Sequence, residues 1–376
     1  MPDCKIKVPF FDASASYISN RLQIDDAVKK VLESGSYING PEVGLFADSL
    51  ANYLNVDHVV PCANGTDALC LALMGMDLKR NDEVIVPAFN FIAAAEAIAF
   101  LGLVPVFADV DSHHFNICAK SIEEKITSKT KAIIVVHLFG GAASMDDIIR
   151  VANQHQIPVI EDVAQSLGSE YGEKKLGTFG TIACTSFFPT KNLACFGDGG
   201  AVFTNNEKLA HKVKMLANHG QQQKYVHKYI GVNSRLDTLQ AAVLLCQLNT
   251  LDQDIEHRRT LAKRYANGLC DLTILLPEET AGIKHSYNQY CIQLSDFQQR
   301  DDLKKYLMDQ GISTMIYYSQ PNHLQEAFGS FGYKAGDFPV AEQLCNKVLA
   351  LPVSPSLTFE HQDYIIEHIK RFLQNG

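Results

Sequence analysis

The chain has 376 residues, of which 47% are hydrophobic and 20% are charged, and its formal net charge is -9. A chain of this length and composition can bury a large core, and we expect it to divide into two domains. The acidic balance argues against a nucleic acid as the main partner, because binding to phosphates requires clustered lysine and arginine.

The cysteines and the N-terminal segment bear on metal binding and location. Ten cysteines are scattered along the chain, with no C-x-x-C pair and no histidine at metal-ligand spacing. We expect buried small apolar residues in a reducing compartment and no metal site. The first residues lack the pattern of a signal peptide, and no apolar run reaches the roughly 18 residues of a membrane span. The sequence therefore predicts a cytoplasmic protein that does not bind membranes.

Short β-branched runs alternate with helix-like segments through the first 205 residues. The strand candidates are 58–62, 83–88, 104–110, 131–140, 157–164, 182–189 and 200–205. Between several of them, apolar residues recur at helical spacing, as in 66–75, 91–102 and 145–156. Apolar strands separated by helices predict an α/β fold whose mostly parallel sheet is covered on both faces.

The pattern changes after residue 205. Apolar residues at helical spacing predict a long helix that begins after Arg235 and continues to about Asn267. Such a helix would carry the chain from a large domain, 1–255, into a smaller α/β domain, 256–376. Strands of the smaller domain are expected at 287–295 and 311–318.

Ligands of parallel sheets bind at the carboxyl ends of the strands, so the residues that follow each apolar run carry the functional information. The first such place is "CANGTDAL", where a strand ends at 62 and a helix opens. Gly65 has no Cβ, so backbone N–H groups can approach a ligand, and a helix N-terminus with the Thr66 hydroxyl is an anion site. An ordinary N-capped helix is the alternative.

Two further strand ends carry polar residues. Asp162 follows a strand that should be central, where an unpaired carboxylate is costly unless it faces a cation such as a protonated ring nitrogen. Gln165 could then bond a neighbouring oxygen; a helix cap or a buried salt bridge is the alternative. Ser186 offers a hydroxyl, and Lys191 projects from the next turn. A desolvated lysine has a lowered pKa and attacks carbonyls, whereas an isolated lysine is more often a surface residue.

One ligand explains all these residues together. Pyridoxal phosphate requires a phosphate cradle, a carboxylate on its pyridine nitrogen and a Schiff-base lysine. The order of phosphate turn, carboxylate and lysine along the chain fits one site at the edge of one sheet.

The motifs "ANGTDAL", "EDVAQSLGSEYGEKKLGTFG", "SFFPTKNLACFGDGGAVFTN" and "GVNSRLDTLQAAVL" resemble the successive motifs of the DegT/StrS family of pyridoxal-phosphate-dependent nucleotide-sugar aminotransferases. The resemblance begins at "SGSYINGPEV", residues 34–43, and covers nearly the whole chain. It implies the aspartate-aminotransferase-like fold type I, with a mostly parallel seven-stranded sheet in the large domain and a smaller C-terminal α/β domain. It also implies a homodimer with shared active sites.

The resemblance assigns roles to individual residues. Lys191 matches the Schiff-base lysine, Asp162 matches the partner of the pyridine nitrogen, and Gln165 matches a contact to the phenolic oxygen of the cofactor. Family members that deoxygenate sugars carry histidine at the lysine position, so a lysine here favours transamination. The remaining matches are phosphate contacts from Gly65, Thr66, Ser186 and the neighbouring subunit's Asn233, and a stacking aromatic ring, Phe91.

The resemblance further implies glutamate as amino donor, an aminated pyridoxamine phosphate form, and a nucleotide-linked keto sugar as acceptor. The segment 218–244 is most similar to the branch that acts on 3-keto sugars. Arg235 could hold a carboxylate or phosphate, although an intersubunit or helix-start salt bridge is an equal alternative. In "YYSQPNHLQ", Tyr317, Ser319 and Asn322 depart from the family pattern. The candidate substrate residues are His227, Arg235, Tyr318 and His323.

Two other functions remain open. One is a pyridoxal-phosphate-binding regulatory protein without turnover, which the complete set of cofactor residues disfavours. The other is a nucleotide-dependent oxidoreductase, which is disfavoured because no G-x-G-x-x-G follows the first strands.

Overall fold

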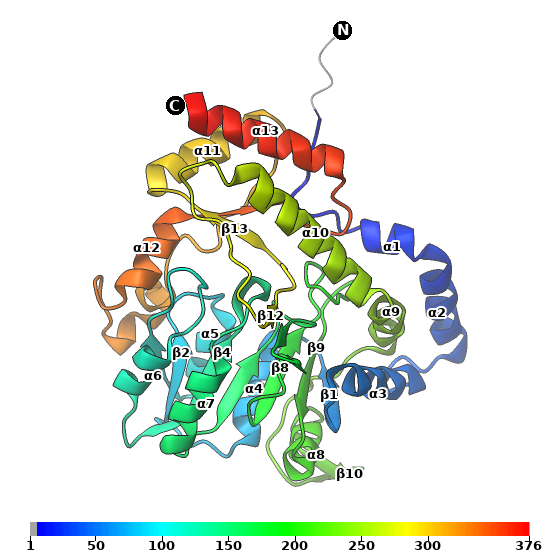
Figure 1. The fold of residues 1–376 in the computed structure, drawn as a ribbon. Helices are drawn as coiled ribbons and strands as arrows, with labels where there is room; N and C mark the ends of the chain where they lie inside the picture. Colours follow the sequence, from blue (N-terminus) through cyan, green and yellow to red (C-terminus); the bar gives the residue numbers. More distant parts are fainter. Residues whose placement is uncertain (1–5, 376) are drawn as a thin grey trace.

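The computed structural model describes residues 6–375, and Figure 1 shows them arranged around a central sheet. The sheet has seven strands in the order β1-β9-β8-β5-β4-β2-β3. Every strand is parallel to its neighbours except β9, which is antiparallel to β1 and β8. The strands are β1 His58–Cys62, β2 Glu83–Pro87, β3 Val104–Ala108, β4 Thr130–Val136, β5 Val159–Asp162, β8 Ile182–Ser186 and β9 Gly200–Thr204. All seven predicted runs form strands, and the mostly parallel seven-stranded sheet is confirmed.

Helices cover both faces of this sheet. Ile134 and Val136 of β4 join the core under one layer of helices, while Ile133 and Val135 join the core under the other. Both faces are therefore apolar, which explains the nearly continuous hydrophobic strand sequences. One layer consists of α4 Gly65–Gly75, α5 Ala93–Phe100 and α8 Glu207–Leu216, and the other of α6 Ala119–Lys125 and α7 Met145–Gln154.

The expected helix after Arg235 is two helices, α9 Thr238–Leu248 and α10 Leu251–Leu269. They separate at Thr250, whose hydroxyl donates to the carbonyl of Gln247 at 3.2 Å and so competes with helical hydrogen bonding. The first part of α10 packs in the core beside α9, and its second part packs in the C-terminal core, so this helix carries the chain between them (Figure 1). A division of the chain at residue 255 stays a prediction.

The C-terminal core surrounds a two-stranded antiparallel sheet of β13 Tyr290–Gln293 and β14 Val348–Leu351. The strand expected at 311–318 is wrong, because β14 occupies the place beside β13 and leaves this segment only isolated bridges at Ile312 and Met315. The helices of this part are α11 Phe297–Asp309, η2 Asn322–Leu324, η3 Glu326–Phe331, α12 Pro339–Lys347 and α13 Phe359–Asn375.

The remaining elements complete the fold. Helices α2 and α3 both pack against α9. They and the smaller elements are α1 Ala15–Ser19, α2 Arg21–Ser34, α3 Pro41–Leu54, η1 Leu138–Gly140, β6 Glu170–Tyr171, β7 Lys174–Lys175, β10 Gln221–Gln223, β11 Val226–His227 and β12 Ile283–Lys284. Within residues 6–375, no helix combines the length and apolar character needed to cross a membrane.

Candidate active site

The turn between β1 and α4 has the geometry of a phosphate cradle. The side chain of Asn64 caps α4 by accepting the N–H of Asp67 at 2.8 Å. The earlier N–H groups of a helix have no intrahelical partner, so those of Gly65 and Thr66 are free to meet an anion. A Cβ on Gly65 would lie 2.6 Å from Cβ of Ser186, which shows how closely the turn packs on the end of β8. The structure thus brings together the three residues predicted to contact phosphate.

Asp162 ends β5 as a buried carboxylate. Its side chain is 8% exposed and accepts the N–H of Ala164 at 2.9 Å. Burial raises its pKa, while that hydrogen bond and electrostatic interactions with Lys191 and His137 act in the opposite direction. A buried carboxylate is stabilised by a cationic partner, and the protonated pyridine nitrogen of the predicted cofactor is such a partner.

Glu161, the residue before Asp162, was missed by sequence reasoning. It is fully buried, and its Oε2 lies 3.1 Å from Nε2 of the equally buried His137. Its oxygens also accept the backbone N–H groups of Gly177, Phe179 and Gly180. The sequence did contain a signal for this residue, because two consecutive carboxylates end the strand. Successive side chains of a strand point to opposite faces, so only one of the two carboxylates could lie on the face predicted to carry the cofactor.

Gln165 and two aromatic residues surround the predicted ring site. Gln165 accepts the N–H of Phe139 at 3.0 Å and donates through Nε2 to the hydroxyl of Tyr318 at 3.0 Å. The ring of Tyr318 is centred 6.3 Å from that of Phe91. Phe91 is 58% exposed, so it is not a core residue, and its ring is available to stack on a planar ligand.

Lys191 lies in the turn after β8, where its N–H donates to the carbonyl of Phe188 at 2.9 Å. Burial lowers its pKa to about 8, with Asp162 partly offsetting the effect. A surface lysine would not be desolvated in this way. The uncharged, nucleophilic form of the amine is therefore substantially populated near pH 8, far below the usual pKa of 10.5.

The cradle, the carboxylate and the amine fit pyridoxal phosphate, and the family assignment agrees. The model of the DegT/DnrJ/EryC1/StrS aminotransferase family matches residues 19–370. The chain belongs to this family. The predicted enzyme class, a pyridoxal-phosphate-dependent aminotransferase, is confirmed.

Individual members of this aminotransferase family match almost end to end. A pleiotropic regulatory protein of Geobacillus stearothermophilus is 41% identical over 98% of this chain and 100% of its own. A UDP-N-acetyl-3-dehydro-alpha-D-glucosamine 3-aminotransferase of Acidithiobacillus ferrooxidans is 42% identical over 97% of this chain and 98% of its own. Among solved structures, S. venezuelae DesV in complex with a ketimine intermediate has a TM-score of 0.95 and 38% identity, covering 98% of this chain and 99% of DesV.

Three other predicted residues of this aminotransferase, Asn233, Arg235 and His227, lie between α8 and α9. Asn233 is exposed, and its neighbour Ser234 accepts the N–H of Ala63 at 3.1 Å, so the loop passes beside the phosphate turn. Arg235 donates to the amide oxygen of Asn218 at 3.0 Å and lines a cavity of about 860 Å³. His227 is exposed in β11, with its Nδ1 2.9 Å from the carbonyl of His219.

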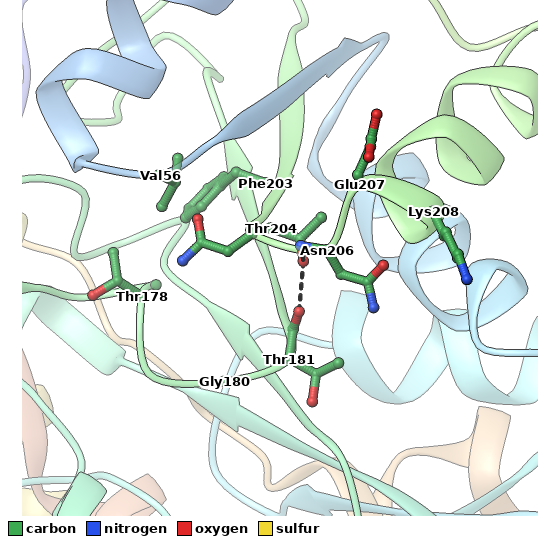
Figure 2. Close-up of a pocket in the computed structure, with 11 residues that line it drawn as sticks. Val56, Thr178, Gly180, Thr181, Phe203, Thr204, Asn206, Glu207 and Lys208 are labelled. Carbon is green, nitrogen blue, oxygen red and sulfur yellow. Dashed lines mark hydrogen bonds between the residues drawn. The ribbon is translucent and has the colours of Figure 1, made fainter.

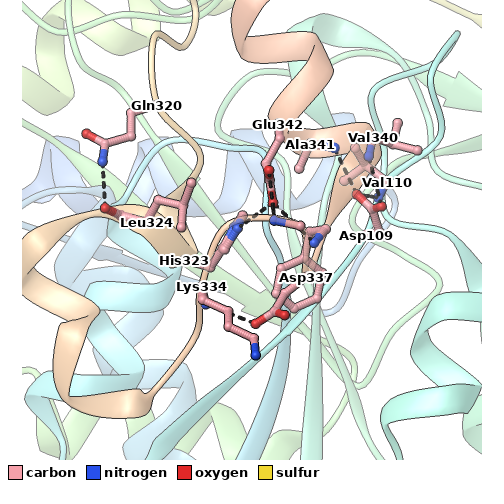
Figure 3. A network of polar contacts seen from close by, with 12 residues as sticks. Asp109, Val110, Gln320, His323, Leu324, Lys334, Asp337, Val340, Ala341 and Glu342 are labelled. Atoms are coloured by element: carbon pink, nitrogen blue, oxygen red, sulfur yellow. Dashed lines mark hydrogen bonds and ion pairs between the residues drawn. The ribbon is translucent and has the colours of Figure 1, made fainter.

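His323, a predicted substrate residue, lies in a buried polar network, and its contact with the substrate stays a prediction. His323 is 2% exposed, and its Nε2 lies 3.1 Å from Oε1 of Glu342. Figure 3 shows this pair in a network that also includes Asp109, which accepts the N–H groups of Val340 and Ala341 at the start of α12. Burial lowers the pKa of His323 against the opposing effect of Glu342. The network joins α12 to the end of β3, so His323 contributes to this packing.

A separate hollow lies at the opposite end of the sheet. Figure 2 shows this cavity of about 560 Å³, which is lined by residues such as Thr178, Thr181 and Asn206. The Thr204 hydroxyl donates to the Thr181 carbonyl at 2.7 Å. Because Thr181 directly precedes β8, the hollow lies at the amino ends of the parallel strands, away from the edge that carries Asp162 and Ser186.

Proposed function

We propose that this aminotransferase moves an amino group from glutamate to the keto group of a nucleotide-linked sugar, with pyridoxal phosphate as cofactor and a pyridoxamine phosphate form between the two half-reactions. The observation that carries the proposal is a buried carboxylate, Asp162, and a desolvated amine, Lys191, that interact electrostatically at the carboxyl edge of the sheet. The names of the relatives support a nucleotide sugar as acceptor. A 3-keto sugar is the first choice, because the Acidithiobacillus relative is named for that position.

The residues of this chain have separate tasks in the reaction. When bound, the cofactor supplies an electron sink that acidifies the Cα–H of the amino donor. Gly65, Thr66 and Ser186 would hold its phosphate, and Asp162 would keep its ring nitrogen protonated. Lys191, whose pKa is about 8, is suited to accept a proton as general base and return it as general acid near neutral pH.

The test of this proposal begins with Lys191→Ala. Borohydride reduction of the wild-type protein should add the mass of the cofactor to the peptide that contains Lys191. The variant should lose that adduct, the visible absorbance of the lysine-bound cofactor, and turnover. Lys29→Ala is a matched control, because its side chain is 72% exposed on α2. Turnover and absorbance retained by Lys191→Ala would refute the assignment.

The acceptor is identified by a panel of 3-keto and 4-keto nucleotide sugars. The glutamate-charged protein is mixed with each sugar, and loss of the spectrum of the aminated cofactor reports amino transfer. Among the candidate substrate residues, we propose Arg235 as the donor of two parallel hydrogen bonds to a sugar carboxylate or phosphate. Arg235→Lys should then raise KM for the acceptor and leave the glutamate half-reaction unchanged.

A homodimer with shared active sites belongs to the same proposal. The loop that carries Asn233 presents Tyr225 and Ile230 with 82% and 94% of their surfaces exposed, which is typical of an apolar contact surface. If Asn233 serves the partner's site, Lys191→Ala and Asn233→Ala are each impaired alone. Subunit exchange between them would restore about a quarter of wild-type activity, because half of the dimers would contain one intact site. No restoration would argue against shared sites.

The alternative of a regulatory protein without turnover is not supported, because the chain matches an aminotransferase family and several relatives are named as transaminases. The two functions separate in one experiment. A regulator would bind the cofactor through Lys191 but would not convert it to the aminated form when glutamate is added.

A further inference from the structure

The residues on both sides of Lys191 are hydrogen-bonded to one distant segment of the chain, Thr190 through its backbone and Asn192 through its side chain. Before the lysine, the carbonyl of Thr190 accepts Nδ2 of Asn288 at 3.0 Å. After it, Nδ2 of Asn192 donates to Oγ of Ser286 at 2.9 Å. Segment 286–289 follows the lysine turn by almost 100 residues and leads directly into β13. We call these two hydrogen bonds the strap, and we call the segment around Lys191 that they hold, residues 187–199, the lysine turn.

The segment that provides the strap is itself fixed. Ser286 is fully buried, and its N–H donates to the carbonyl of Gly140 at 3.0 Å. A Cβ on Gly140 would lie 2.6 Å from the nitrogen of Tyr287, so the two backbones are in direct contact. On the other side, the buried guanidinium of Arg258 donates to the carbonyl of Tyr287 at 3.3 Å. Segment 286–289 therefore packs against η1, the turn in which the N–H of Phe139 donates to Gln165.

The lysine turn needs such support. Between the end of β8 and the start of β9 the chain has no helix or strand, so regular secondary structure does not fix the backbone of Lys191. Asn288 is 6% exposed, so water cannot readily replace its hydrogen bond to Thr190. The amide oxygens of Asn288 and Asn192 are buried without a hydrogen-bond partner in the described part of the chain. Both asparagines therefore act in the strap as hydrogen-bond donors, through Nδ2.

We infer that Asn192 and Asn288 are positioning residues that fix the Lys191 backbone, so that its amine stays within reach of the reacting atoms. The inference rests on the proposed role of Lys191. Proton transfer depends on hydrogen-bond reach, and a displacement of about 1 Å can cost on the order of 100-fold in rate. Each bond secures one side of the same turn, and Nδ2 of Asn192 also donates to the carbonyl of Leu167 at 3.3 Å, so we expect the loss of either asparagine side chain to loosen the turn.

The test compares Asn288→Ala, Asn192→Ala and the double variant. Each single variant should lower kcat about 10- to 100-fold while KM for the sugar changes less than about twofold. The double variant should be about as slow as the slower single variant, because both bonds act on one turn. Asn288→Asp keeps the shape but loses the donor, so it should not restore kcat. Gln289→Ala is the matched control, since this neighbour is also nearly buried but its side chain does not bond the turn.

A second measurement tests whether the strap restrains the lysine turn, and it does not depend on turnover. Amide hydrogen exchange of the peptide spanning residues 187–199 should become faster in Asn288→Ala and Asn192→Ala, and should stay at the wild-type rate in Gln289→Ala. The pH dependence of the visible absorbance of the lysine-bound cofactor should shift in the same two variants. The inference would be overturned if both asparagine variants exchanged at the wild-type rate and kept kcat within about twofold of the wild-type value. Failure of the proposed function would appear instead as turnover that survives Lys191→Ala.

Discussion

Replacing Lys191 by methionine should stabilise the cofactor-free protein at neutral pH. Burial lowers the pKa of this amine from 10.5 to about 8. At about 1.4 kcal/mol per pKa unit, holding the charged form in the folded chain costs about 3 kcal/mol. Methionine has a similar length and no charge, so Lys191→Met removes this cost. Because the lysine side chain keeps some contact with solvent, we take 3 kcal/mol as the upper limit and expect about 1–3 kcal/mol.

The pH dependence gives this prediction its sign. Below pH 8 the amine is charged in both the folded and the unfolded chain, and the full cost is present. Between pH 8 and 10.5 the unfolded chain holds more protons than the folded one, so the free energy of unfolding of the wild type rises through this window. Above pH 10.5 the amine is neutral in both states, and the advantage of Lys191→Met disappears.

Urea unfolding of both proteins, followed by circular dichroism at one fixed protein concentration, measures the difference at pH 7 and at pH 10.5. Lys120→Met is the control, because the Lys120 side chain is 85% exposed on α6 and its replacement should change little at either pH. Equal stability of the wild type and Lys191→Met at pH 7, or a difference that persists at pH 10.5, would show that Lys191 is not desolvated.

Three further substitutions test the surroundings of Lys191. Gly65→Ala should weaken cofactor binding and destabilise the fold by about 1–3 kcal/mol, because the new Cβ would lie 2.6 Å from Cβ of Ser186. A cofactor titration that gives the wild-type Kd would contradict this prediction. Glu161→Gln should lower the free energy of unfolding by about 3–5 kcal/mol, because its amide NH₂ would face backbone N–H donors. A loss of only about 1 kcal/mol in urea unfolding would contradict this prediction. Tyr318→Phe removes the acceptor of Gln165 and should cost about 1 kcal/mol by the same assay, whereas unchanged stability would indicate that this bond is dispensable.

The residues predicted to bind the cofactor could be grouped from the sequence because each follows an apolar run. Strands buried on both faces produce continuous hydrophobic stretches, and the carboxyl ends of parallel strands meet at one edge. Gly65, Asp162 and Ser186 could therefore be placed together before their distances were known. Phe91 was placed by family resemblance alone, and its exposure beside Tyr318 became visible only in the fold.

The errors have a common physical origin. Hydrophobic spacing continues through Thr250, so the pattern gave no sign that a side-chain hydroxyl separates α9 from α10. Segment 311–318 has the composition of a strand, but β14 takes the position beside β13. In each case a hydrogen bond or a packing partner overrides the local pattern.

By itself, the sequence determined the seven strands of the sheet and the chemical groups at its edge, because periodicity and residue type are local properties. Tertiary structure decided the environment of those groups. The desolvation that lowers the pKa of Lys191 depends on everything packed around it. The strap from Asn288 to Thr190 joins residues 98 positions apart. Contacts of this kind are fixed by how the two cores meet, and no local pattern in the chain records them.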